Sequence, residues 1–210
     1  MGICPFSIIF LQVNKIRAAI TGSIGSGKST FANYIASKDY IVINADDISK
    51  DILSFDEKIK KKIIKEFGSN SYNDGKLNKK FIAAQVFSDP TKLNKLNSIL
   101  HPRVLQKIDT LIEIKYKDEK IVFIEAALIY EAEIEKKFDY VVLVTADFDI
   151  RLKRSVANGK FTDDDFINRD KSQIPQEEKE KRADFIFLHN GSKKDLIKKA
   201  DLLLLTLNTG

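Results

Sequence analysis

The sequence predicts an α/β fold, in which a five-stranded parallel sheet is flanked by helices and carries a helical insert. Short apolar runs alternate with segments of helical period, which is typical of strands joined by crossover helices. A glycine-rich stretch directly follows the first run, and a helical stretch too long for one crossover separates the second run from the third. The length of 210 residues suits one domain with a buried core and a small insert.

Five apolar runs are predicted to form the strands. Because helices are expected between them, these runs favour a parallel sheet that is covered on both faces. The runs are residues 16–21 (IRAAIT), 40–44 (YIVIN), 120–125 (KIVFIE), 140–144 (YVVLV) and 185–188 (FIFL).

Helical signals fill the rest of the chain. Residues 28–37 (KSTFANYIAS) predict a helix after the glycine-rich stretch, and residues 68–76 (GSNSYNDGK) predict a loop. Apolar residues at helical spacing between the second and third strands predict an insert that covers the carboxyl edge of the sheet. Thr162 can cap a helix with three aspartates in its first turn, and Pro175 can open another.

Composition and charge limit the partners. The net charge is +5, but the lysines are spread out and interleaved with acids, so we expect neither a nucleic acid nor a membrane as partner. Cys4 is the only cysteine, which excludes an intrachain disulfide and fits the cytoplasm. The apolar start is shorter than a spanning helix and has no basic region of a signal peptide, so residues 1–15 are interpreted as an N-terminal extension.

The glycine-rich stretch predicts a site for a nucleoside triphosphate. Residues 22–29 (GSIGSGKS) fit the phosphate-binding pattern G-x-x-x-x-G-K-[ST], with a strand before and a helix after. Backbone N–H groups and the helix N-terminus can surround the phosphates, because glycines keep side chains away. The predicted contacts are Gly22, Ser23, Ile24, Gly25, Ser26, Gly27, Lys28, Ser29 and Thr30, with the Ser29 hydroxyl on Mg²⁺.

Carboxylates at the ends of predicted strands favour phosphoryl transfer. The chain has no D-x-x-G and no N-K-x-D, which argues against a GTP-driven switch. Asp46 follows the second strand, at the edge where ligands bind, and is placed to take a proton from an acceptor hydroxyl. The alternative is that Asp46 or Asp47 only caps a helix starting at Ile48. Glu125 ends the third strand and either contacts Mg²⁺ through water or has no role.

The ordered set of motifs resembles the dephospho-CoA kinase family. The matching pieces are ITGSIGSGKST, INADDIS, LHPRV, IEAALIYE, VVLVTADFDIRLKR, RDKSQIP and ADFIFLHNGS, and they cover nearly all of residues 16 to about 200. The resemblance implies a P-loop kinase fold with a core (residues 16–55, 118–150 and 183–207), an acceptor-binding insert (56–117) and a lid region (151–182). It also implies transfer of a phosphoryl group from ATP, with Mg²⁺, to the ribose 3′-hydroxyl of dephospho-CoA.

The same resemblance implies a role for each matched residue. Asp46 would be the general base, and Lys28 would hold the ATP phosphates. The remaining implied contacts are Arg154 and Arg169 at the transferring phosphoryl group, His101 and Pro102 in an acceptor-side turn, Glu131 at the substrate, and Asn190 and Gly191 near the adenine.

The sequence also departs from the family pattern. Asn44 stands where the family usually has an aspartate, and Ala127 where it usually has a proline. Asn158 and Gly159 replace an Arg-Asp pair of the lid, which removes one cation. Two alternatives stay open: another nucleoside or nucleotide kinase, and a regulator that binds nucleotide without transferring phosphate. A requirement for Asp46 in turnover separates the kinases from the regulator.

Overall fold

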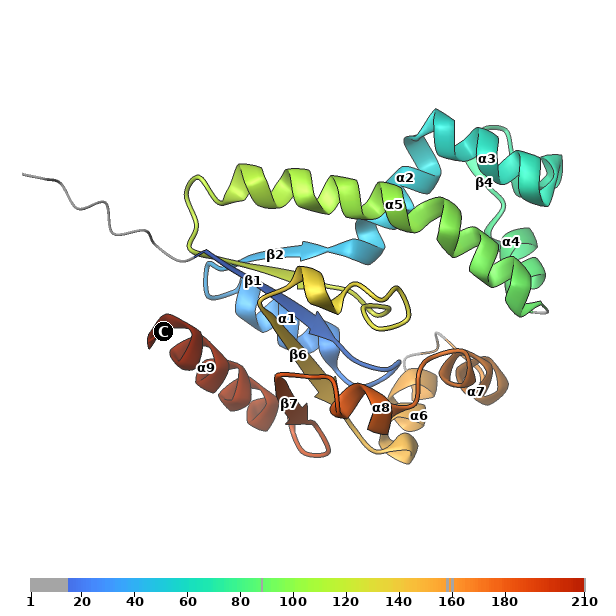
Figure 1. Cartoon of the computed structure of the whole chain (residues 1–210). Helices are drawn as coiled ribbons and strands as arrows, with labels where there is room; N and C mark the ends of the chain where they lie inside the picture. The colour runs from blue at the N-terminus through green and yellow to red at the C-terminus, as the bar shows by residue number, and fades with distance from the viewer. Residues whose placement is uncertain (1–14, 88, 158, 160, 210) are drawn as a thin grey trace, which may run out of the picture.

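A parallel sheet of five strands forms the centre of the molecule, as predicted (Figure 1). The computed structural model describes residues 15–87, 89–157, 159 and 161–209, so residues 1–14 of the predicted extension and Asn158 lie outside the described residues. The strands lie in the order β2-β5-β1-β6-β7. Their bounds are β1 (Ile16–Thr21), β2 (Ile41–Asn44), β5 (Ile121–Glu125), β6 (Tyr140–Thr145) and β7 (Phe185–Leu188).

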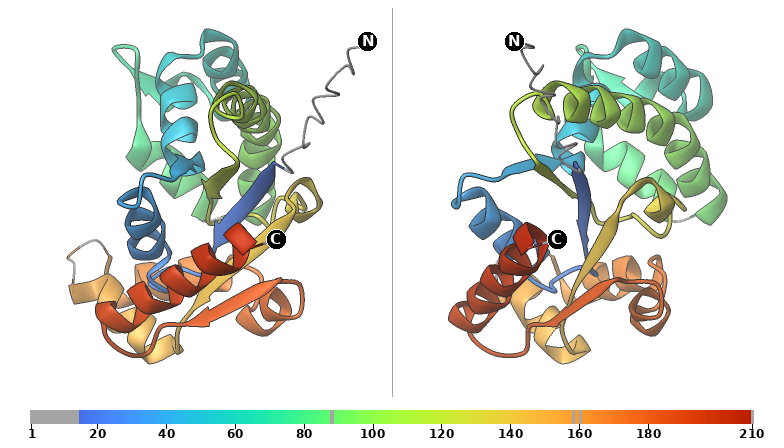
Figure 2. Two further views of the ribbon diagram at one scale, coloured as in Figure 1. Left: turned by 90° about the vertical axis from the view of Figure 1, so that its left-hand side faces the viewer. Right: turned by 60° about the vertical axis from the view of Figure 1, so that its left-hand side comes forward.

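Helices cover both faces of the sheet, because side chains along each strand alternate between two apolar cores (Figures 1 and 2). Ile20 and Phe123 belong to the core shared with α1 and α9, whereas Ala19 and Ile124 belong to the core shared with α2 and α5. The helices are α1 (Lys28–Ala36), α2 (Ala45–Phe55), α3 (Glu57–Phe67), α4 (Lys79–Phe87), α5 (Pro90–Lys115), α6 (Phe148–Ala157), α7 (Asp163–Lys171), α8 (Gln176–Glu180) and α9 (Lys193–Thr209).

The segment predicted as a loop at residues 68–76 contains a small hairpin. Strands β3 (Tyr72–Asn73) and β4 (Lys76–Leu77) pair antiparallel in it. Asp74 and Gly75 connect them with φ angles of 48° and 78°, the left-handed conformation that two-residue hairpin turns require. The turn residues were therefore recognised correctly, but the prediction of a loop without strands was wrong.

Helix α2 begins earlier than the sequence suggests. The prediction of a helix starting at Ile48, capped by Asp46 or Asp47, is wrong: the helix starts at Ala45. The cap is Asn44, whose Oδ1 accepts the Asp47 N–H at 3.0 Å. Asp46 and Asp47 lie in the first helical turn, where acidic side chains interact favourably with the helix dipole.

Helix α5 runs without a break through His101 and Pro102. The expectation of a turn at this pair is wrong. A proline inside a helix removes one backbone hydrogen bond and normally favours a break. Here Leu100, Val104 and Ile108 are all buried in the core on either side of the proline, and this packing keeps the helix continuous.

The region from α6 to α8 follows the predicted helix starts. Thr162 forms a capping box with Asp165, since each residue's side chain bonds the other's backbone N–H. Pro175 is the N-cap residue of the short helix α8. In Figure 1 these three helices lie together at the end of the sheet where β6 and β7 terminate.

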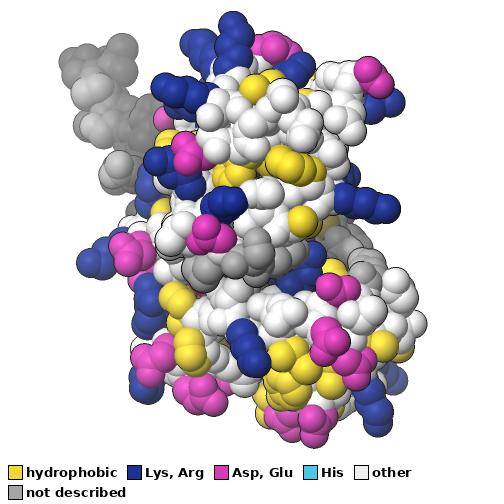
Figure 3. All heavy atoms as spheres, turned by 90° about the vertical axis from the view of Figure 1, so that its right-hand side faces the viewer, with side chains coloured by type: hydrophobic (Ala, Val, Ile, Leu, Met, Phe, Trp, Pro, Cys, Tyr) yellow, Lys and Arg dark blue, Asp and Glu magenta, His cyan; other side chains and the backbone are white. Residues whose placement is uncertain are grey.

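The surface carries charges of both signs. In the view of Figure 3, Lys and Arg side chains are interspersed with Asp and Glu side chains over both the upper and the lower part of the molecule. Among the described residues, no helix combines the length and the apolar character needed to cross a bilayer.

Candidate active site

The candidate site lies at the carboxyl ends of the strands. Because all pairings within the sheet are parallel, these ends share one edge. The register pairs Glu125 at the end of β5 with Ile20 of β1 on one side and with Asn44 of β2 on the other. The glycine-rich loop leaves the sheet directly after β1, so strand pairing alone brings Glu125 close to it.

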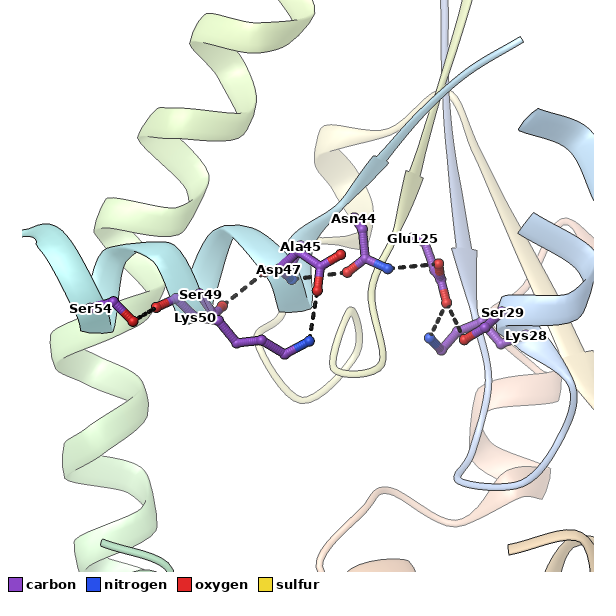
Figure 4. A network of polar contacts seen from close by, with 9 residues as sticks. All are labelled: Lys28, Ser29, Asn44, Ala45, Asp47, Ser49, Lys50, Ser54 and Glu125. Carbon is purple, nitrogen blue, oxygen red and sulfur yellow. Dashed lines mark hydrogen bonds and ion pairs between the residues drawn. The ribbon is translucent and has the colours of Figure 1, made fainter. Parts of the chain in front are cut away.

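Glu125 is a buried carboxylate that accepts three hydrogen bonds (Figure 4). Lys28 Nζ and Ser29 Oγ donate to its Oε1 at 2.7 and 2.6 Å. Asn44 Nδ2 donates to its Oε2 at 2.9 Å. The residue is only 3 % exposed, and an unpaired buried polar group is strongly destabilising, so the three donors offset the cost of burying this side chain.

The contacts of Asn44 explain why an amide can replace the aspartate that is usual in the resembled family. Its Oδ1 caps α2 while its Nδ2 donates to Glu125. An aspartate could cap the helix equally well, but it would place a second carboxylate against Glu125 without a proton to share. The amide therefore keeps the cap and removes this repulsion.

The N-terminus of α1 is open to an anion. Its N-cap residue is Gly27, no side chain caps it, and no acidic residue lies in its first turn. By contrast, α2, α3, α5 and α7 all begin with a side-chain cap. Uncapped N–H groups, the positive end of the helix dipole and Lys28 together make this position suited to phosphate groups.

Two backbone carbonyls of the loop are held from its outer side. Arg151 donates to the Ile24 carbonyl at 3.3 Å, and His189 Nδ1 lies 3.1 Å from the Ser26 carbonyl. In a trans peptide the carbonyl and the next N–H point in opposite directions. Holding these carbonyls outward therefore directs the N–H groups of Gly25 and Gly27 inward.

His189 also contacts the lid region. Its Nδ1 lies 3.2 Å from an Arg154 nitrogen, and Arg154 contacts the Gly191 carbonyl at 3.5 Å. Burial is the main cause that lowers the pKa of His189, and the nearby Arg154 charge acts in the same direction. Asn190 accepts the Asp147 N–H at 2.9 Å, which joins the turn after β7 to the turn after β6.

Arg169 is the second arginine expected at the phosphates. It lies in α7, and its guanidinium carbon is 4.7 Å from the centre of the Phe161 ring, within the range of a cation–π interaction. Partial burial lowers the pKa of both Arg169 and Arg154, but an arginine side chain still stays charged at neutral pH.

The residues expected to contact the acceptor lie further apart than the residues around Glu125. Asp46 is exposed in the first turn of α2, two positions after Asn44. His101 is half-buried in α5, and burial lowers its pKa. Pro102 instead lines a groove of about 680 Å³ between α5 and the junction of α2 with α3. Glu131 forms an ion pair with Lys179 at 2.8 Å.

The structure thus brings Lys28, Ser29 and Glu125 into direct contact and places the N-terminus of α2 beside them through Asn44. It does not show contacts from these residues to His101, Pro102 or Glu131.

Three residues at the site were missed from the sequence: Arg151, Gln173 and His189. Gln173 Oε1 accepts the Ile24 N–H at 3.2 Å. For His189 a signal existed, since it directly follows the predicted strand at residues 185–188, and strand ends identified Asp46 and Glu125 by the same rule. Arg151 and Gln173 lie on a helix and in a loop, where no local pattern marks a contact with the glycine-rich loop.

We predict that Gly27→Ala weakens ATP binding about 100-fold. Gly27 has a φ of +99°, and a Cβ added to it would lie 2.3 Å from His189 Nδ1, so the loop would have to shift. Calorimetric titration with ATP measures the change. Gly75→Ala is the matched control, because its φ is +78° but the nearest atom lies 3.9 Å away in the insert. Unchanged ATP affinity in Gly27→Ala would contradict the described loop geometry.

The chain is similar to known proteins of one family. The sequence profile of the dephospho-CoA kinase family matches residues 16–195. A dephospho-CoA kinase of Fusobacterium nucleatum is 35 % identical over 87 % of this chain and 93 % of its own length. A dephospho-CoA kinase of Corynebacterium efficiens is 32 % identical over 92 % of this chain and 98 % of its own length.

Solved structures lead to the same family. The chain is similar to TT1252 from Thermus thermophilus, with a TM-score of 0.78, 31 % identity and coverage of 92 % and 98 % of the two chains. It is also similar to dephospho-CoA kinase from Campylobacter jejuni, with a TM-score of 0.69, 28 % identity and the same coverage. The chain therefore belongs to the dephospho-CoA kinase family.

Proposed function

We propose that the chain transfers the terminal phosphoryl group of ATP to the ribose 3′-hydroxyl of dephospho-CoA, which gives CoA and ADP. The observation that carries this proposal is the convergence of the open α1 N-terminus, Lys28 and the end of β5 at one sheet edge, next to the first turn of α2 with Asp46. Phosphoryl transfer depends mainly on positioning and on neutralising charge, and this edge supplies both. Membership of the dephospho-CoA kinase family supports dephospho-CoA as the acceptor.

The nucleotide would lie along the loop from Gly22 to Thr30. Its phosphate oxygens would accept hydrogen bonds from backbone N–H groups of the loop and of the first turn of α1, and from Lys28. In the present structure Lys28 Nζ lies on Glu125. Binding of ATP would therefore have Lys28 exchange a carboxylate partner for a phosphate partner, at little cost because a charge-assisted hydrogen bond is kept.

A magnesium ion fits the donors present at this point. Ser29 Oγ and Glu125 Oε1 lie 2.6 Å apart, and both are oxygen ligands of the type that Mg²⁺ prefers. Mg²⁺ usually takes one or two protein oxygens plus phosphates and water, so we propose Ser29 as a direct ligand and Glu125 as a contact through water. When bound, the ion supplies neutralisation of the phosphate charge.

We propose Asp46 as the general base that accepts the hydroxyl proton. Arg154 and Arg169 would neutralise the transferring group, and Asn190 and Gly191 would lie near the adenine. The lid region would exclude water, which otherwise competes with the acceptor. His101 and Pro102 would contact the acceptor from α5. We also propose that the enzyme acts in the cytoplasm, because its single cysteine fits a reducing compartment.

An acceptor panel separates this proposal from the kinase alternative. We expect ADP release to depend on dephospho-CoA, and to stay near background with adenosine, AMP, uridine or pantetheine. A faster turnover with any of the other acceptors would favour a different nucleoside or nucleotide kinase. Binding of ATP without release of ADP for any acceptor would favour a regulator.

We predict that Asp46→Asn lowers the turnover number about 10²–10⁴-fold while the affinity for ATP stays within about twofold. The amide keeps the size of the side chain but cannot take a proton. The matched control is Asp47→Asn, which alters the next residue of α2, an exposed side chain paired with Lys50. Steady-state kinetics and ATP titrations measure both variants. Full turnover in Asp46→Asn would remove Asp46 from the mechanism.

A further inference from the structure

Lys179 is a fully buried lysine that the proposed mechanism does not use. Its side chain is 0 % exposed, and its Nζ lies 2.8 Å from Glu131 Oε1. Removing an ammonium group from water is costly, and its attraction to one carboxylate only partly offsets this cost. A pair of this kind is weak evidence for a contribution to stability, so another benefit should be sought in what the pair holds.

Glu131 holds a second group in addition to Lys179. Its Oε1 also accepts the Ile174 N–H at 3.0 Å. One carboxylate oxygen, on the segment that follows β5, therefore contacts both sides of the turn that contains Pro175. It accepts a hydrogen bond from the Ile174 N–H and forms an ion pair with Lys179. Glu131 fixes the path of the chain between α7 and α8.

The residue next to Ile174 reaches the glycine-rich loop. Gln173 Oε1 accepts the Ile24 N–H at 3.2 Å. The Ile24 carbonyl is held by Arg151, which is paired with Asp170 of α7. The N–H and the carbonyl of Ile24 are thus both bonded to side chains of residues 151–182. Of these two side chains, Gln173 is the one adjacent in sequence to Ile174, whose N–H is held by Glu131.

The surroundings of the pair are polar as well. Four further buried side-chain atoms of these two segments have no hydrogen-bond partner within the described chain. They are Tyr130 Oη, Glu131 Oε2, Glu135 Oε2 and Gln176 Oε1. Apolar side chains would fill the same space without this desolvation cost. The buried polar groups therefore fit a role in positioning the chain better than a role in stabilising the fold.

We propose that the Glu131–Lys179 pair is a positioning element for the nucleotide site, which acts through Ile174 and Gln173 on the Ile24 N–H of the phosphate-binding loop. The proposal rests on the proposed binding of ATP by this loop. It replaces the expected direct contact between Glu131 and the substrate.

Two neutral double variants test the proposal. Glu131→Gln/Lys179→Met removes both charges but keeps an oxygen that can accept the Ile174 N–H. Glu131→Leu/Lys179→Met removes the charges and the acceptor. We expect the Gln/Met variant to bind ATP with an affinity within about twofold of the wild-type chain. The Leu/Met variant should bind ATP about tenfold more weakly, because Gln173 would no longer be held against the Ile24 N–H. Chemical denaturation verifies that both variants are folded.

A double-mutant cycle with Gln173→Ala separates positioning from a general loss of structure. If Glu131 acts through Gln173, adding Gln173→Ala to the Leu/Met variant should weaken ATP binding by less than about twofold further, although it weakens binding about tenfold in the wild-type chain. Additive losses, or unchanged ATP affinity in the Leu/Met variant, would overturn the proposal.

An alternative measurement covers the case in which a variant does not fold. If the Leu/Met variant does not fold, amide exchange in the wild-type chain replaces it. The Ile24 and Ile174 N–H groups should exchange at rates within about threefold of each other, and rates that differ by more than this would overturn the proposal. ATP is titrated without acceptor, so a wrong acceptor assignment leaves the result unaffected. Absence of ATP binding in the wild-type chain would instead refute the proposed function.

Discussion

The site is organised around the buried carboxylate of Glu125. This side chain is the common acceptor for Lys28 and Ser29 at the start of α1 and for Asn44 at the end of β2. Its position follows from the backbone, because β5 lies between β1 and β2 and the register places Glu125 beside Ile20 and Asn44. A buried anion requires its donors, so the loop, α1 and α2 are held in a fixed relation to one another.

The shape of the phosphate-binding loop depends on residues far away in the sequence. Arg151 and His189 hold two of its carbonyls outward, and Gln173 holds one of its N–H groups. Glycine is required where these partners approach, since a Cβ on Gly25 would lie 2.4 Å from the Arg151 carbonyl oxygen. Two of the three supporting residues, Arg151 and Gln173, lie within residues 151–182, so the shape of the loop depends on the position of this segment.

The parts of the fold that local rules govern could be predicted from the sequence. The strands were found because a strand covered on both faces needs a continuous apolar run, and the phosphate-binding loop was found because its pattern is contiguous. Local rules failed where tertiary packing kept a helix continuous, or where several neighbouring residues could cap the same helix. His101 and Pro102 predict a break that the packing of α5 overrides, and Asn44 rather than either following aspartate became the cap of α2. Arg151, Gln173 and His189 could not be found by spacing, since each meets the loop across more than 120 residues.

Glu125 joins Lys28 to Ser29, the proposed Mg²⁺ ligand, so the dependence of ATP affinity on Mg²⁺ reports on the role of this carboxylate. The measurement is a calorimetric titration of the wild-type chain and of Glu125→Gln with ATP, with and without Mg²⁺. We expect Glu125→Gln to bind metal-free ATP at least as tightly as the wild-type chain, because Lys28 is released, whereas the increase in ATP affinity on addition of Mg²⁺ should be about tenfold smaller. An equal increase in both proteins would refute a role for Glu125 at the proposed Mg²⁺ site.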